Sequence, residues 1–392
     1  MFIPYGKQNI NQQDIDAVIQ VLQSDFLTQG PQVPLFEKTV AEYVGAEYAL
    51  AVNSATSALH IACLALGLQK GDVLWTSPIT FVASANCALY CGADVDFVDI
   101  DPQTYNLSVD ALQKKLVQAK LENKLPKIVI PVHLCGQSCD MEKIHALSKE
   151  YGFHIIEDAS HAIGGKYQSA YVGACKYSDI TIFSFHPVKI VTTAEGGMAL
   201  TNNAALAQKM DLLRSHGVTR NTALMNKDTE GPWYYQQVEL GFNYRMTELQ
   251  AALGVSQMHR LTQFVEKRHT ISNKYNEILK DLPIILPYQI PESYSGLHLY
   301  VIRLKLGELK ASRKQVFEAL RAKGIGVNVH YIPVHTQPYY ENLDFKLGDF
   351  PVAEAYYDSA ISLPMYPDLT DDQIQCVYES LKEVLVEQCS WL

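Results

Sequence analysis

The chain has 392 residues, of which 32 are Lys or Arg and 42 are Asp or Glu, so its net charge is −10. Hydrophobic residues make up 48% and charged residues 19% of the chain, a composition that excludes an intrinsically disordered protein. The acidic balance argues against a nucleic-acid binder, and no apolar run approaches the roughly 20 residues of a membrane span. We therefore expect a globular protein with neither nucleic-acid nor membrane partners.

The cysteines and the N-terminal segment bear on the compartment. Cys87 and Cys91 are separated by three residues, as are Cys135 and Cys139, whereas structural zinc sites usually contain tighter C-x-x-C pairs. We expect buried free thiols and no metal site. Residues 1–7 show no basic region followed by an apolar stretch, which predicts no signal peptide. Reduced thiols without an export signal favour the cytoplasm.

An N-terminal helix is predicted from Ile15, Val18, Ile19 and Leu22, which recur at helical spacing after the potential N-cap residue Asn11. From there to about residue 202, short runs rich in β-branched residues alternate with helical patterns. The expected strands are 48–52, 73–76, 95–100, 128–133, 154–157, 180–185 and 198–201. The expected helices include 56–66, 84–90, 109–121 and 141–151. This alternation predicts an α/β fold with a mainly parallel sheet, whose ligand binds beyond the carboxyl ends of the strands.

A different pattern begins at about residue 246. We expect a long helical stretch over 247–275, a strand at 299–304, a helix at 313–323, a short strand at Val327–Val329 and a final helix at 372–387. The sequence therefore predicts a large α/β domain at residues 1–250 and a smaller C-terminal α+β domain at residues 251–392.

Residues that could bind a phosphate follow the first strand. The segment 53–59, Asn-Ser-Ala-Thr-Ser-Ala-Leu, opens a helix with small residues and hydroxyls, where free backbone N–H groups suit an anion. The same residues could equally form an ordinary Ser/Thr helix cap. The segment matches neither the dinucleotide glycine pattern nor the P-loop.

Three further side chains follow strand ends. Phe81 could stack on a flat ligand, although such an aromatic is more often part of the core. Asp158 ends an apolar strand, where a carboxylate needs a cation or several donors, and a salt bridge or cap is the simpler interpretation. Lys189 lies just beyond another strand, where desolvation would free its amine to attack a carbonyl. A phosphate site, an aromatic, an acid and a lysine together match the needs of pyridoxal 5′-phosphate (PLP).

Six segments resemble the DegT/DnrJ/EryC1/StrS sugar aminotransferases, and the resemblance runs from Tyr5 to about Tyr366. They are 53–59, 80–81, 157–161, 183–189, 194–197 and 241–246. The most specific piece is Phe-Ser-Phe-His at 183–186 with Lys189 and the Glu-Gly-Gly at 195–197. It is similar to the branch of the family that aminates C4 of UDP-2-acetamido-2,6-dideoxy-β-L-arabino-hexos-4-ulose, a UDP-4-keto-6-deoxy-N-acetylhexosamine, in pseudaminic acid biosynthesis.

The resemblance implies a fold-type I PLP-dependent aminotransferase that uses L-glutamate and a UDP-sugar and acts as a homodimer with shared active sites. It implies that Lys189 is the catalytic lysine that binds PLP covalently and then moves the proton. The implied cofactor-binding residues are Ala55, Thr56, Phe81, Asp158, His161, Ser184 and, from the second subunit, Asn243. The implied sugar-binding residues are Tyr5, Asp25, Phe26, Leu27, Thr28, His330, Tyr331, Ile332 and Pro333.

Several alternatives remain open at this point. Gly196 and Gly197 could merely turn the chain into the next strand. A branch of the family that dehydrates its sugar has His in place of the lysine, so Lys189 favours amino transfer. The substrate could also be another nucleotide 4-keto-sugar, such as a dTDP, GDP or UDP-pentose sugar. The protein could also be a non-catalytic module that has kept the fold.

Overall fold

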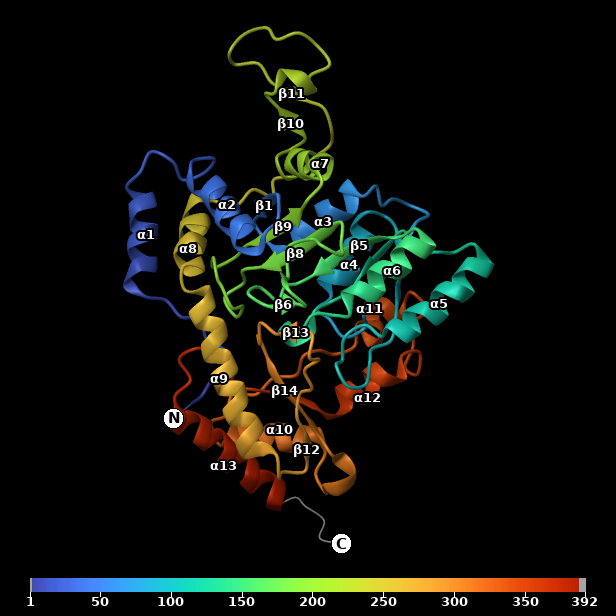
Figure 1. Cartoon of the computed structure of the whole chain (residues 1–392), viewed down its shortest axis with the longest axis vertical. Helices are drawn as coiled ribbons and strands as arrows, with labels where there is room; N and C mark the ends of the chain where they lie inside the picture. The colour runs from blue at the N-terminus through green and yellow to red at the C-terminus, as the bar shows by residue number, and fades with distance from the viewer. Residues whose placement is uncertain (1, 388–392) are drawn as a thin grey trace.

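The computed structural model describes residues 2–387, and its centre is a seven-stranded sheet (Figure 1). In order across the sheet the strands are β1 (Tyr48–Val52), β9 (Gly197–Thr201), β8 (Ile180–Ser184), β5 (His154–Asp158), β4 (Ile128–Ile130), β2 (Val73–Thr76) and β3 (Asp94–Phe97). Only β9 runs antiparallel to its neighbours β1 and β8, and the other paired strands are parallel. The predicted mainly parallel sheet is confirmed.

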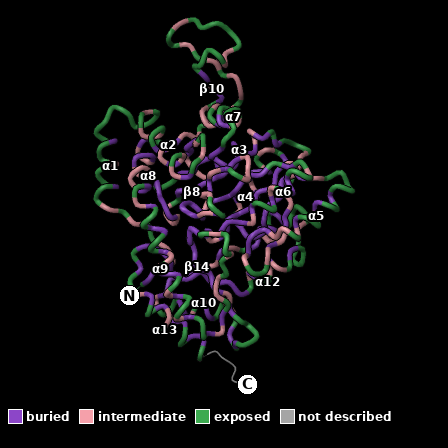
Figure 2. Tube along the Cα trace, in the orientation of Figure 1, coloured by how far each residue is buried: buried purple, intermediate pink, exposed green. Residues whose placement is uncertain are grey.

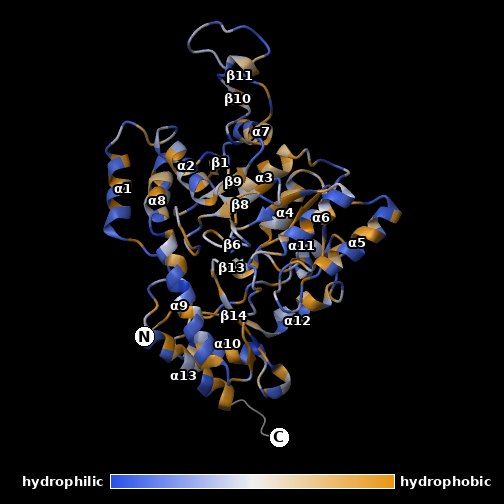
Figure 3. Cartoon of the chain, in the orientation of Figure 1, coloured by the Kyte–Doolittle hydropathy of each residue, from blue (hydrophilic) through white to orange (hydrophobic). Residues whose placement is uncertain are grey.

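Helices cover both faces of this sheet, because alternate residues of each buried strand face opposite sides. In β4, Ile128 and Ile130 pack with α3 and α4, whereas Val129 packs with α5 and α6. The large-sheet helices are α2 (Gln32–Val44), α3 (Ala55–Ala65), α4 (Ala83–Tyr90), α5 (Val109–Glu122), α6 (Met141–Tyr151) and α7 (Ala204–Arg214). Figure 2 shows the buried strands between exposed helix faces, and hydrophilic and hydrophobic residues alternate along α5 in Figure 3.

A second hydrophobic cluster surrounds a smaller antiparallel sheet. This sheet consists of β12 (Ile284–Ile285), β14 (Tyr300–Leu304) and β15 (Ala360–Leu363). The helices of this half of the chain are α8 (Glu248–Met258), α9 (Leu261–Leu279), α10 (Arg313–Ala322), α11 (Pro338–Glu341), α12 (Pro351–Ser359) and α13 (Asp371–Glu387). The cluster draws on residues from Ile271 onward and on Ile3 of the N-terminal segment. The division of the chain at residue 250 stays a prediction.

Two expectations for this half differ from the structure. The helical stretch over 247–275 is broken into α8 and α9, because Arg260 leaves the helical conformation at φ −110° and ψ 2°. The run Val327–Val329 is not a strand, since only Asn328 forms an isolated bridge, with Ser362.

The remaining elements are short, apart from the N-terminal helix. Two small sheets lie outside the main ones: β6 (Lys166–Tyr167), β7 (Ala170–Tyr171) and β13 (Ser293–Tyr294) form a three-stranded sheet, and β10 (Val218–Thr219) pairs with β11 (Gln236–Gln237). The segment 218–240, which we call the arm, projects away from the body beyond α7 (Figure 1).

No helix within residues 2–387 is long and apolar enough to cross a bilayer.

The cysteines are free thiols with different exposures. Cys63, Cys87, Cys139 and Cys175 are buried, as expected, whereas Cys91 and Cys135 are half-buried. The expectation of a buried thiol is wrong for Cys376, which is exposed on α13. Position 389 lies outside the described residues.

The N-terminal helix α1 (Gln12–Leu22) begins at Asn11, as predicted, in a capping box with Asp14. The Asp14 side chain is almost fully buried against α8 and the start of α9. Its carboxylate accepts hydrogen bonds from Ser256 Oγ at 2.6 Å and Gln257 Nε2 at 2.8 Å, and it pairs with Arg260. This network fixes α1 to the body.

Replacing Asp14 by alanine is expected to lower the free energy of unfolding by about 3–5 kcal/mol, because it leaves the Arg260 charge without its buried partner. Asp16→Ala on the same helix is the matched control, since Asp16 is exposed and only accepts a bond from Gln12. Urea unfolding of the two variants measures the difference. Equal losses in both variants would contradict this role of Asp14.

Candidate functional site

A cavity of about 560 Å³ lies at the carboxyl ends of β2, β5 and β8, where the alternating pattern predicts a ligand site. Its walls contain ten of the predicted site residues. They are Tyr5, Ala55, Thr56, Phe81, Asp158, His161, Ser184, Lys189, His330 and Tyr331. The fold therefore brings together residues that are up to 326 positions apart, from Tyr5 to Tyr331.

One wall of the cavity is the N-terminus of α3. Ser54 is the N-cap, and its hydroxyl accepts the N–H of Ser57 at 3.1 Å. The first helical residues, Ala55 and Thr56, carry N–H groups that have no acceptor within the helix, and the helix dipole adds positive potential there. The Ser184 side chain lines the same cavity from the end of β8. This wall suits a phosphate group.

Gly197 allows α3 to approach the sheet this closely. A Cβ atom at Gly197 would lie 2.4 Å from the backbone N of Ala55 and 2.5 Å from the carbonyl carbon of Ser54. At Gly196 a Cβ would lie 2.2 Å from Thr193 Oγ1. Gly197 therefore serves close packing against the N-terminus of α3, and Gly196 serves close packing against Thr193, in addition to any role in turning the chain.

The carboxylate of Asp158 is buried in the cavity, at the end of β5. Its Oδ2 accepts a hydrogen bond from Ser84 Oγ at 2.5 Å, and its Oδ1 accepts one from the Ser160 N–H at 3.1 Å. The adjacent Glu157 points to the opposite face of the sheet and pairs with the buried His133 at 2.7 Å. Asp158 is thus an oriented negative charge with a side open to the cavity.

Lys189 follows β8 in a turn closed by its own N–H, which donates to His186 O at 2.9 Å. The loop that carries Lys189 is fixed by the N–H of Phe185, which donates to Gly196 O, and by Thr193 N–H, which donates to Phe185 O. Burial lowers the pKa of Lys189 to about 8, although the charge of Asp158 opposes this shift. The uncharged fraction of the amine near neutral pH is therefore larger than that of an ordinary lysine.

His161 and Tyr331 form a hydrogen-bonded pair on another wall. The Cys135 N–H donates to His161 Nδ1 at 3.2 Å, so the ring proton lies on Nε2, which is 3.0 Å from the Tyr331 hydroxyl. Burial, together with the positive charge of Lys189, holds the pKa of His161 well below its usual value. His161 is therefore neutral and donates to Tyr331, whose own proton is free for a ligand.

His330 and Tyr5 lie side by side, with ring centroids 5.5 Å apart. His330 Nδ1 is 2.7 Å from Ser362 Oγ. Burial and the charge of Lys189 lower the pKa of His330 to about 3, so this ring is also neutral. Two neutral imidazoles thus flank the single lysine.

The other predicted residues do not line this cavity. The segment Asp25–Thr28 is exposed between α1 and α2, and Asn243 is exposed beside the base of the arm. Ile332 is 48% exposed, whereas Pro333 is buried. Their roles in binding stay predictions.

Sequence reasoning did not identify several hydroxyl residues of the cavity wall as site residues, among them Thr80 and Ser84. Ser84 lies inside α4, where its sequence context is that of an ordinary small helical residue. Only the packing of α4 beside the end of β5 reveals its contact with Asp158.

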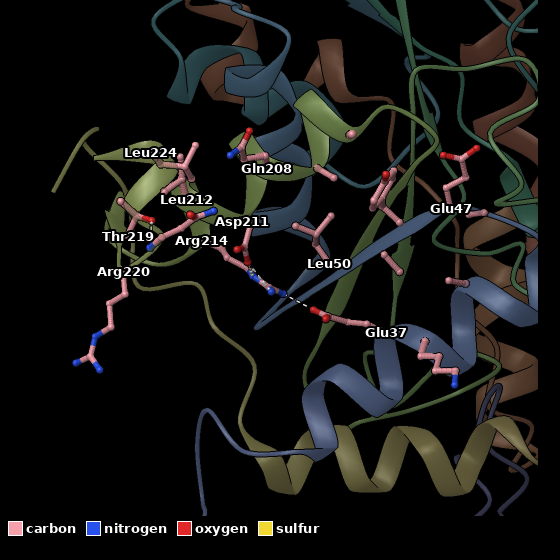
Figure 4. A pocket seen from close by; sticks show the side chains of 18 of the residues that line it. Glu37, Glu47, Leu50, Gln208, Asp211, Leu212, Arg214, Thr219, Arg220 and Leu224 are labelled. Carbon is pink, nitrogen blue, oxygen red and sulfur yellow. Dashed lines mark hydrogen bonds and ion pairs between the residues drawn. The ribbon is translucent and has the colours of Figure 1, made fainter. Parts of the chain in front are cut away.

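A larger hollow of about 1030 Å³ lies elsewhere, between α2, β1, α7 and the base of the arm (Figure 4). Its most prominent charges neutralise one another, because Arg214 pairs with Glu37 and, at 2.7 Å, with Asp211. Glu37 accepts the Ala51 N–H and Arg214 donates to the Ala51 carbonyl, so both side chains cap the free edge of β1. These contacts stabilise the edge of the sheet. We therefore place the candidate active site in the smaller cavity.

The donor set of the smaller cavity fits PLP. The α3 N-terminus and the Ser184 hydroxyl suit the phosphate, Asp158 suits a protonated ring nitrogen, and the Lys189 amine suits the aldehyde. The close approach of Gly197 to Ala55 provides the narrow backbone cradle that a phosphate needs.

Comparisons with known proteins agree with this assignment. Residues 8–382 match the model of the DegT/DnrJ/EryC1/StrS aminotransferase family. The chain is 38% identical, over 98% of its own length and 97% of the relative's, to the UDP-4-amino-4,6-dideoxy-N-acetyl-beta-L-altrosamine transaminase of Campylobacter jejuni.

Two solved structures extend the likeness to the fold. PseC of Helicobacter pylori, an aminotransferase involved in the biosynthesis of pseudoaminic acid, superimposes with a TM-score of 0.90 at 32% identity, covering 99% of this chain and 100% of PseC. The putative sugar aminotransferase Spr1654 of Streptococcus pneumoniae, in its PMP-form, has a TM-score of 0.89 at 28% identity, covering 98% of this chain and 99% of Spr1654.

Proposed function

Because the chain belongs to the DegT/DnrJ/EryC1/StrS aminotransferase family, we propose that it transfers an amino group from L-glutamate to C4 of a UDP-4-keto-6-deoxy-N-acetylhexosamine. The family membership makes the protein a PLP-dependent sugar aminotransferase. The observation that supports the proposed site most strongly is that Lys189, Asp158 and the α3 N-terminus line one cavity. The UDP-sugar is proposed from the relative in Campylobacter jejuni, whose name specifies such a substrate.

The residues that line the cavity would have the following roles. The N–H groups of Ala55 and Thr56, with Ser184, hold the phosphate, and Phe81 covers one face of the ring. Asp158 faces the ring nitrogen and keeps it protonated. Bound PLP supplies an electron-withdrawing ring that stabilises negative charge on the substrate carbon next to the nitrogen.

Proton movement is assigned to the Lys189 amine. A free amine with a pKa near 8 can accept a proton from one substrate carbon and return it to another at neutral pH. His161 is neutral, so it does not compete with Lys189 as a proton donor, and Tyr331 can donate a hydrogen bond to the bound ring or sugar. Tyr5 and His330 would contact the sugar.

The assigned role of Lys189 predicts how covalent attachment of PLP depends on pH. In the apo-protein, the rate of attachment is expected to rise with pH to a plateau, with a midpoint near 8, because only the uncharged amine attacks the aldehyde. Stopped-flow absorbance over a pH series measures it. In Asp158→Asn the midpoint is expected to fall further, since the Asp158 charge raises the pKa of Lys189. A wild-type midpoint near 10.5 would contradict the desolvation of this amine.

A homodimer is proposed from the arm and from Asn243. The arm exposes Trp233 (70%), Tyr235 (55%) and Leu240 (79%) while projecting away from its own body (Figure 2). Apolar side chains on such a projection are stabilised when a second copy covers them. Asn243, exposed at the base of the arm, would then reach the phosphate of the partner's cofactor.

Replacing Trp233 by serine is expected to weaken the dimer by about 2 kcal/mol or more, because buried tryptophans dominate interface energetics. Asp228→Asn on the same arm is the control, since it alters a polar residue. Sedimentation velocity over a concentration series gives both dimer constants. An unchanged constant for Trp233→Ser would show that the arm does not bind the second copy.

A substrate panel tests the proposed function. Purified protein is incubated with L-glutamate and a series of UDP, dTDP and GDP 4-keto-sugars, and 2-oxoglutarate release is measured. The proposal predicts that the UDP-N-acetylhexosamine derivative has the highest kcat/KM. If a dTDP sugar, a GDP sugar or a UDP-pentose is turned over faster, the proposed substrate is wrong, although the protein is still an aminotransferase.

A further inference from the structure

The turn from Thr80 to Ser84, which leads into α4, carries a short chain of buried hydroxyls that ends on Asp158. Thr80 Oγ1 lies 2.8 Å from Ser84 Oγ, and Ser84 Oγ lies 2.5 Å from Asp158 Oδ2. The exposed fractions of Thr80, Ser84 and Asp158 are 3%, 1% and 5%. Solvent therefore does not compete for these hydrogen bonds.

The charge of Asp158 decides which group donates each of these hydrogen bonds. An ionised carboxylate only accepts hydrogen bonds, so the Ser84 hydroxyl donates to Asp158. The Ser84 proton is then committed, and the Thr80 hydroxyl donates to Ser84 Oγ. Hydrogen bonds to a charged acceptor are shorter and about twice as strong as neutral ones.

Asp158 is held from several directions at once. Its Oδ1 accepts the Ser160 N–H at 3.1 Å, its backbone N–H donates to Pro131 O at 3.0 Å, and its carbonyl accepts the His133 N–H at 3.0 Å. The Ser84 hydroxyl is the side-chain donor that fixes the second carboxylate oxygen, Oδ2. Without it, rotation of the carboxylate about the Cβ–Cγ bond would be restrained only at Oδ1.

The same turn also carries Phe81, which lies between Thr80 and Ser84 in sequence and is 60% exposed at the cavity wall. The turn from Thr80 to Ser84 therefore sets the positions of two groups: the aromatic ring proposed to cover the cofactor and the carboxylate proposed to meet its nitrogen. A shift of this turn would displace both groups together.

We propose that Ser84 is a positioning residue, whose hydroxyl orients the Asp158 carboxylate toward the ring nitrogen of the cofactor, with Thr80 supporting it. This inference rests on the proposed role of Asp158. Through Ser84, α4 would contribute to the reaction in addition to packing against the sheet.

The test compares Ser84→Ala with Ser77→Ala. Ser77 is also buried, lies in the same β2–α4 connection and only accepts the Ile79 N–H at 3.3 Å. Ser84→Ala is expected to weaken PLP binding about tenfold and to shift the pH dependence of the bound cofactor's visible absorbance, because ring protonation depends on the carboxylate. Ser77→Ala is expected to change neither.

Combination with Asp158→Asn separates a role through Asp158 from a general structural role. In the Asp158→Asn background, Ser84→Ala is expected to cause no further loss of PLP affinity. A full additional loss there, or wild-type affinity and absorbance in the single variant, would overturn the inference.

Two further readouts keep the result interpretable. Thr80→Val removes only the hydroxyl that donates to Ser84. We expect it to shift the pH dependence of the absorbance in the same direction as Ser84→Ala, but by less. This variant tests the inference if Ser84→Ala does not fold. If wild-type protein takes up no PLP, the proposed function fails together with the inference. If wild-type protein binds PLP on Lys189 but neither Ser84→Ala nor Thr80→Val alters the absorbance, only the inference fails.

Discussion

Replacing Lys189 by alanine is expected to lower the rate of amino transfer by at least ~10³-fold, because the group that moves the proton is removed. The cavity keeps Asp158 and the α3 N-terminus, so PLP is still expected to bind, now without a covalent bond. Steady-state release of 2-oxoglutarate measures the rate, and equilibrium dialysis measures PLP binding.

Lys176→Ala is the matched control, because Lys176 is an exposed lysine just before β8, whereas Lys189 lies just after it. Its rate is expected to equal that of the wild type. Residual turnover within tenfold of wild type in Lys189→Ala would refute the assigned role of Lys189.

Replacing Asp158 by asparagine is expected to weaken both PLP affinity and turnover, because a neutral amide does not hold the ring proton. Truncating one side of a buried, hydrogen-bonded charge pair costs about 2–5 kcal/mol, which corresponds to roughly a 30- to 5000-fold loss. The amide has nearly the same size as the carboxylate, so the cavity itself is expected to persist. Equilibrium dialysis and kcat/KM measure the two effects.

Asp179→Asn provides the comparison for Asp158→Asn. Asp179 precedes β8 at the opposite edge of the sheet, where it pairs with His154 at 3.4 Å. Loss of that charge is expected to leave PLP affinity unchanged. If the two variants bind PLP equally well, Asp158 does not meet the ring nitrogen.

The meeting of Asp158 and Lys189 was predictable because both follow strands of one sheet. The apolar runs before them, 154–157 and 180–185, identify buried strands, and parallel strands place their carboxyl ends at the same edge. The order of the strands was not needed for this conclusion. The same rule placed Ala55 and Thr56 at this edge of the sheet, and their binding of a phosphate stays a prediction.

Other parts of the site depend on packing that a single sequence does not display. The contact of Ser84 with Asp158 joins residues 74 positions apart and arises only when α4 packs beside β5. The reason for Gly197, its approach to the backbone of Ala55, is likewise a distance between two elements. Neither contact has a local motif.

Two of the element predictions failed for comparable reasons. Residues 247–275 contain no proline at the break, yet Arg260 leaves the helical conformation there, and its side chain pairs with Asp14 of α1. The apolar residues Val327 and Val329 suggested a strand, although the only bridge is made by Asn328. Tertiary contacts overrode local propensity at both places.

The most direct test of the account is the covalent site of PLP. Purified protein is incubated with PLP and reduced with borohydride, and its peptides are mapped by mass spectrometry. The account predicts one reduced pyridoxyl phosphate per chain, on the peptide that contains Lys189, and none on this peptide after Lys189→Ala. Modification spread over exposed lysines such as Lys176, with Lys189 unmodified, would contradict the account.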